Sequence, residues 1–171
     1  MIPDASDDLS KRLALLRLLQ LASPALPIGA FAYSQGLEPA VAAAIVHDEA
    51  TASAWLTGLL EGPLARQDRA RFPSTLAGEF ARATAHFGID VRTAAETFAF
   101  TWAEAQTSAA VRLIPLGQSA GVRILARAGR SIPAAVDGAL ALDDDDLGGA
   151  APGLALLSAA HETQYSRLFR S

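Results

Sequence analysis

The chain has 171 residues, which suits one domain whose hydrophobic core needs no metal or disulfide support. It has no cysteine, which excludes disulfides, thiolate metal sites and a cysteine nucleophile. Its net charge is −4 without any basic stripe, and polar residues interrupt every apolar run, so we expect neither a nucleic-acid interface nor a membrane span.

The N-terminal part predicts a short disordered arm followed by an amphipathic helix. Residues 1–8 are acidic where a secretory signal would be basic and then apolar, so we expect a cytoplasmic protein. The helix is expected over residues 9–22 and ends before Pro24. Four leucines recur at helical spacing along it, namely Leu9, Leu13, Leu16 and Leu19.

Residues 22–38 break the helical pattern. Pro24 and Pro27 each fix φ and remove a backbone donor, so no helix passes through. Phe31 and Tyr33 place two large rings in this segment, which a flexible surface loop does not need. The stretch fits an ordinary buried connection between helices, or a fixed loop that presents its groups to a partner.

Ser34 lies in this stretch, where a serine can act as a nucleophile or as a helix cap. No strand precedes it and it lacks the Gly-x-Ser-x-Gly setting of a hydrolase nucleophile, so a catalytic role is not expected. It is interpreted instead as the N-cap of a helix that starts at Gln35. Glu38 lies beyond the usual capping-box position and is therefore available for another contact.

The remaining sequence predicts further helices and no strand, because no segment alternates with a period of two. Asp48 and either Asp90 or Thr93 are expected helix starts, Gly88 an expected helix end, and Pro115 an expected kink or division. The helix from Asp48 should direct Trp55, Leu56, Leu59 and Leu60 inward until Gly62 and Pro63 strain or stop it. The expected ranges are 35–46, 48–62, 73–87, 90–114, 117–128 (closed by Gly129), 131–142 (opened by Ser131 and Pro133) and 152–164. We therefore predict an all-α, single-domain, irregular bundle of about eight helices over residues 1–171.

No pattern for metal, nucleotide or covalent chemistry emerges. The aspartates at 143–146 lack the spacing of a calcium loop and are better explained as a solvated run. His47, His86 and His161 lie far apart and do not form an i, i+4 pair. A phosphate-binding Gly-Lys-Ser/Thr loop is absent. We expect no cofactor, no metal ligand set and no enzyme activity.

Three blocks of the sequence resemble the urease accessory protein UreF family. They are LLQLASPALPIGAFAYSQGLE at 18–38, VRLIPLGQSAG at 111–121 and HETQYSRLFRS at 161–171. The resemblance covers residues 9 to about 68 and about 76 to 171. Between them, where family members carry further helices, this chain has only a short polar link. The chain therefore resembles a member shortened in its middle, either as a naturally short protein, as an engineered or partial version, or because the given sequence lacks the middle segment.

The resemblance implies a urease maturation factor that takes part in nickel insertion. In the family, the protein binds the scaffold UreD (UreH in some species), recruits the nickel-carrying GTPase UreG and acts with it on apo-urease, and a homodimer is possible. The tail 164–171 resembles an interface hot spot, although it could instead pack on its own domain. The alternative function is a stand-alone activator of GTP hydrolysis by UreG. The expected partner-binding residues are Tyr33, Ser34, Glu38, Arg112, Gln118, Tyr165, Arg167, Phe169 and Arg170.

Overall fold

The computed structural model describes residues 5–23, 36–64 and 76–143, which hold helices joined by turns and no strand. The all-α prediction is confirmed, with six α-helices and one π-helical turn in the described ranges where about eight helices were expected for the whole chain. The helix expected over 152–164 lies outside these ranges. The elements are α1 (Ala5–Leu21), α2 (Leu37–Ala42), α3 (Glu49–Leu59), η1 (Leu60–Leu64), α5 (Leu76–His86), α6 (Val91–Leu113) and α7 (Gln118–Leu140).

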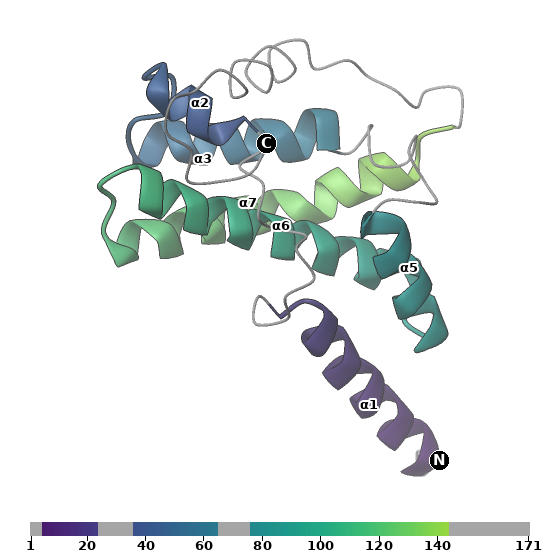
Figure 1. The fold of residues 1–171 in the computed structure, drawn as a ribbon. Coiled ribbons are helices and arrows are strands. Elements are labelled where there is room, and N and C mark those ends of the chain that lie inside the picture. Colours follow the sequence, from purple (N-terminus) through teal and green to yellow (C-terminus); the bar gives the residue numbers. More distant parts are fainter. Residues whose placement is uncertain (1–4, 24–35, 65–75, 144–171) are drawn as a thin grey trace.

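The centre of the described fold is a hairpin of α6 and α7, which are its two longest helices and make the most extensive contact among the described elements. Figure 1 shows α3 lying along this hairpin and the short α2 beside it. Leu37, Leu56, Trp102 and Ile124 are among the buried side chains of the shared core. Of the residues expected to face inward on α3 and η1, Leu56, Leu59 and Leu60 are buried and Trp55 packs partly buried against them.

Local sequence signals set several helix ends as predicted. Asp48 caps α3, because its carboxylate accepts a hydrogen bond from the Thr51 backbone N–H at 2.8 Å. Asp90 caps α6 in the same way, accepting from the Thr93 N–H at 2.9 Å. Gly88 follows α5 with a φ of 69°, the left-handed conformation that favours glycine.

Two expected helix starts differ from the prediction. Helix α1 begins at Ala5, so residues 5–8 of the expected arm are helical. Helix α2 begins at Leu37, two residues later than expected, and its N-cap is Gly36 with a φ of 83° rather than Ser34. A left-handed residue directly before the helix turns the chain sharply, which glycine does at little cost.

The largest difference between the sequence prediction and the structure concerns helix α7. The sequence predicted two helices divided at Gly129, yet one helix runs from Gln118 through Pro133 to Leu140. An interior proline loses one backbone hydrogen bond. Ala128, Ile132 and Val136 continue one buried stripe across that position, so packing against the core outweighs the local cost.

Helix α1 projects from the bundle, with the N-terminus at its far end (Figure 1). It is seated through Leu18, which is buried in a small cluster with Phe80 and Ala94, and through the partly buried Leu21. The four leucines at the predicted spacing are exposed, and so is Leu15.

Candidate functional site

The turn between α6 and α7 is built by Pro115. A residue before proline avoids the helical region, and Ile114 accordingly has φ −113° and ψ 144° and ends α6. The Leu116 N–H then donates to the Ile114 carbonyl at 2.7 Å, and Gly117 caps α7. The prediction that Pro115 would kink or divide a helix is confirmed as a division, and it makes a tight helical hairpin.

Gly121 holds the two helices of the hairpin close together. A Cβ on Gly121 would lie 3.0 Å from the Val111 Cγ2 and 3.7 Å from the Thr107 Cγ2 of α6. The two helices therefore approach closely at Gly121. It is not found at Gly117, whose surroundings are open and whose role is that of N-cap.

The hairpin tip presents two of the predicted contact residues to solvent. Arg112 in the last turn of α6 and Gln118 at the start of α7 are both exposed and flank the same turn. Val122, one turn further along α7, is 69% exposed and adds an apolar contact point that the sequence did not single out. Glu38, unlike these two residues, is only 6% exposed in the first turn of α2 and offers a partner little surface.

An ion-pair cluster fixes this end of α7 against α3. Arg123 donates from Nη2 to Glu49 Oε2 at 2.7 Å and from Nε to Glu49 Oε1 at 3.0 Å. Arg127 lies 3.7 Å from the same carboxylate and donates to the Ser53 hydroxyl at 3.3 Å. The Arg123 hydrogen bond holds the pKa of Glu49 below its ordinary value. Sequence analysis missed this cluster because its two halves are 74 positions apart.

The turn before α3 lies at the same end of the bundle as the α6–α7 turn (Figure 1). It carries the exposed Ile45 and His47, followed by the capping residue Asp48, whose pKa is lowered chiefly by the Thr51 N–H hydrogen bond. We call the surface formed by this turn and by the hairpin tip the hairpin end. It combines exposed cationic, amide and apolar groups on rigid helix termini, which suits contact with another protein.

Six of the nine predicted contact residues lie outside the described residues. They are Tyr33, Ser34, Tyr165, Arg167, Phe169 and Arg170. The structure therefore brings Arg112 and Gln118 together, buries Glu38, and leaves the proposed docking loop and tail as predictions.

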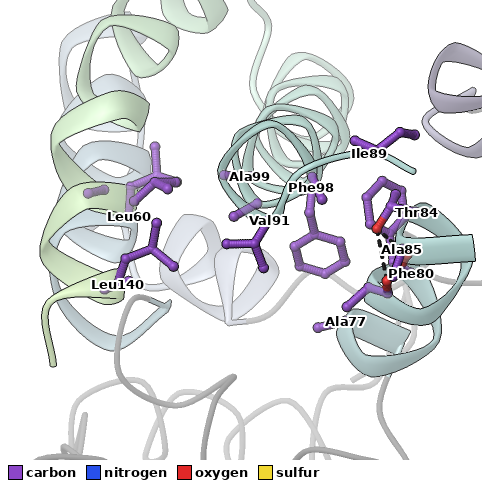
Figure 2. A pocket seen from close by; sticks show the side chains of 16 residues that line it. Leu60, Ala77, Phe80, Thr84, Ala85, Ile89, Val91, Phe98, Ala99 and Leu140 are labelled. Carbon is purple, nitrogen blue, oxygen red and sulfur yellow. Dashed lines mark hydrogen bonds between the residues drawn. The ribbon is translucent and has the colours of Figure 1, made fainter. Parts of the chain in front are cut away.

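An apolar hollow lies at the other end of the bundle. It has a volume of about 240 Å³ and is lined mainly by side chains of α5, α6 and α7, with Leu60 from η1 (Figure 2). Its one hydroxyl, that of Thr84, hydrogen-bonds the Phe80 and Ala81 carbonyls at 3.0 Å. None of these described lining residues is ionisable, so none of them can act as a base that would activate the Thr84 hydroxyl.

The described ranges hold neither a candidate metal site nor a candidate membrane span. No group of three or more His, Asp or Glu side chains gathers there in a way that could hold a metal ion. No helix of those ranges is both long enough and apolar enough to cross a bilayer.

Comparison with known proteins gives a consistent result. Residues 63–129 match the family description UreF. A urease accessory protein UreF of Methylibium petroleiphilum is 40% identical over 222 aligned positions, covering 92% of this chain and 94% of that relative. The UreF proteins of Chromohalobacter salexigens and of Pseudomonas putida strain W619 are 39% and 37% identical, and each alignment covers 93% of this chain.

The alignments also show that this chain is shorter inside the matched region. The first one extends over 222 positions, whereas this chain has 171 residues, so the relative carries at least 51 positions without a counterpart here. Since the alignment covers almost the whole of both proteins, the difference is internal. This agrees with the sequence interpretation of a shortened member.

Proposed function

The chain belongs to the UreF family of urease accessory proteins, and from this premise we propose that it is a non-catalytic urease maturation factor that works in the cytoplasm. In this proposal it binds the UreD/UreH scaffold, recruits the GTPase UreG, and the complex delivers nickel to apo-urease. The observation that carries the proposal is the extent of the similarity, since the relatives named urease accessory protein UreF align with 92–93% of this chain.

The hairpin end supplies a surface for one of these contacts. Arg112 and Gln118 are exposed at adjacent helix termini, and the Pro115 turn and the Gly121 crossing hold those termini in place. Groups on such rigid elements bind with little loss of conformational freedom. We assign UreG recruitment to this surface and UreD/UreH docking to the tail 164–171 together with the loop around Tyr33.

Co-expression with UreD/UreH and UreG, followed by pull-down and sizing of the complex, tests both assignments. Truncation after Ala160 should abolish UreD/UreH binding, and undiminished binding refutes the docking tail. Arg112→Ala combined with Gln118→Ala should leave UreD/UreH bound but reduce UreG recruitment. Arg130→Ala, an exposed substitution about three turns further along α7, serves as the control and should change neither contact.

A stand-alone activator of UreG is the second candidate, favoured by the exposed position of Arg112 at the hairpin tip. An arginine inserted into a nucleotide site stabilises charge that develops during GTP hydrolysis. This candidate predicts faster hydrolysis by UreG with this chain alone, and loss of that acceleration with Arg112→Lys. Unchanged hydrolysis in the absence of UreD/UreH excludes it.

A further inference from the structure

The hairpin end consists of two parts that lie far apart in the sequence. One part is the turn over residues 43–48 that leads into α3, and the other is the tip between α6 and α7 with Arg112 and Gln118. A partner that contacts both parts at once needs them at a fixed spacing, because loose groups lose conformational freedom on binding. The contact that sets this spacing therefore bears on recruitment.

The turn before α3 is well ordered by its own contacts. Val46 is 1% exposed, and its N–H donates to the Ala40 carbonyl at 3.2 Å. The Thr51 hydroxyl accepts hydrogen bonds from the backbone N–H groups of His47 and Asp48 at 3.1 Å and 3.0 Å. Since Pro115 and Gly121 hold the tip in a similar way, each part is stiff within itself.

The Glu49–Arg123 ion pair joins these two parts at the surface. Glu49 is the first residue of α3, directly after the turn, and Arg123 lies in α7 close behind the tip. The guanidinium contacts both carboxylate oxygens, with Nη2 at 2.7 Å from Oε2 and Nε at 3.0 Å from Oε1. Such a two-pronged pair fixes orientation as well as distance.

The fold itself does not depend on this pair. Helices α3 and α7 share the core beneath it, where Leu56 and Ile124 are fully buried. Loss of the ion pair should therefore leave the bundle folded and release only the surface connection between the turn and the tip.

A second arginine shows in which direction the released carboxylate would move. Arg127 lies 3.7 Å from the Glu49 carboxylate and also donates to the Ser53 hydroxyl at 3.3 Å. It is one helical turn further from the tip than Arg123, which corresponds to about 5.4 Å along α7. Without Arg123, Arg127 attracts the carboxylate away from the tip.

We propose that Glu49 and Arg123 are positioning residues of the hairpin end, whose ion pair sets the spacing between the turn and the tip and thereby the affinity for UreG. The link to affinity rests on the assignment of UreG to this surface under the proposed function. The link to spacing concerns this chain alone and is tested separately.

Distance measurements between two spin labels test the spacing without any partner. The native chain has no cysteine, so Ala43→Cys in the turn and Ser119→Cys near the tip, both exposed, give a singly defined pair of labels. Pulsed electron paramagnetic resonance should show a narrow distance distribution. Arg123→Gln should shift or broaden it, and an unchanged distribution overturns the proposal.

Exchanging the two charges separates positioning from direct contact. Glu49→Arg combined with Arg123→Glu rebuilds an ion pair between the same helices and should restore the narrow distribution. A partner that touched Arg123 itself would instead meet a glutamate in this variant. Restored UreG binding therefore supports positioning, whereas loss of binding with a restored distance shows direct contact and overturns it.

UreG affinity is measured on this chain co-expressed with UreD/UreH, at a temperature where circular dichroism shows every variant folded. Arg123→Gln and Glu49→Gln should each weaken UreG binding by about 3- to 10-fold, the range for contacts that position a binding surface indirectly. The matched control is Arg92→Gln, which breaks the Arg92–Asp137 ion pair between α6 and α7 at the opposite end of the hairpin. It should change neither the label distance nor the affinity.

Failure of this inference and failure of the proposed function give different results. A wild-type complex that does not bind UreG refutes the UreG assignment, and with it the link to affinity, while the label distances still decide the link to spacing. Wild-type binding that Arg123→Gln leaves unchanged overturns the positioning role and leaves the proposed function in place.

Discussion

Gly121 offers the sharpest test of how the hairpin is held together. In Gly121→Ala the new Cβ would lie 3.0 Å from the Val111 Cγ2, too close for ordinary contact. Valine in a helix has essentially one favoured χ1 rotamer, so Val111 cannot turn away freely. The helices must separate or the rotamer must change, and overpacking of this kind costs about 1–3 kcal/mol.

Helix propensity opposes that cost and supplies a control. Replacing glycine by alanine inside a helix gains about 1 kcal/mol, so Gly121→Ala should lose about 0–2 kcal/mol in net stability. Gly129 lies in the same helix with nothing within 4 Å of its missing Cβ, so Gly129→Ala should gain about 1 kcal/mol. The two substitutions are chemically identical and differ only in their neighbours.

Urea unfolding measures the difference between the two variants, and thermal melting supports it at about 2–4 °C per kcal/mol. In a Val111→Ala background the blocking methyl is gone, and Gly121→Ala should then stabilise the protein as Gly129→Ala does. Equal stabilisation by both alanines in the native background would refute the close crossing. Failure of Val111→Ala to reverse the loss would show that Val111 is not its cause.

Three further outcomes follow from burial and charge. Arg123→Gln should lower the free energy of unfolding at pH 7. The loss should shrink as pH falls below 4.5, because the pKa of Glu49 is depressed in the folded protein and protonation in acid removes the stabilisation that its carboxylate gives. Urea midpoints measured across pH check this. Ile124→Ala, at a fully buried site, should cost about 2–5 kcal/mol in urea unfolding, whereas Val122→Ala should change little. Pro133→Ala should raise stability by about 1–3 kcal/mol, seen as a higher melting temperature, because proline is the least favourable residue inside a helix and this one is exposed within the continuous α7.

The sequence was sufficient to predict helix ends wherever one residue determines the local backbone. Asp48 and Asp90 cap helices through hydrogen bonds to a residue three positions later, and such contacts depend on little else. Pro115 divides two helices because it restricts the residue before it. Family resemblance likewise depends on local blocks of sequence and was confirmed.

The sequence was insufficient to predict the structure wherever contacts between distant segments determine it. Pro133 and Gly129 suggested a helix boundary, but a buried stripe on both sides keeps α7 continuous. Periodicity showed that the leucines of α1 share a face, yet it could not show whether a neighbour covers that face. The Glu49–Arg123 pair was invisible for the same reason, since nothing in either segment indicates the other.

The contacts that hold the hairpin end do not depend on the segment that this chain lacks. The contacts that hold the tip are the Gly121–Val111 crossing, the buried Ile114 and the Glu49–Arg123 pair, and all of them join described residues of this chain. The segment matched to the family, residues 63–129, contains the whole α6–α7 turn. None of these contacts needs the positions that the relatives carry in addition. We therefore expect the hairpin end to keep its geometry and its docking capacity in the short chain.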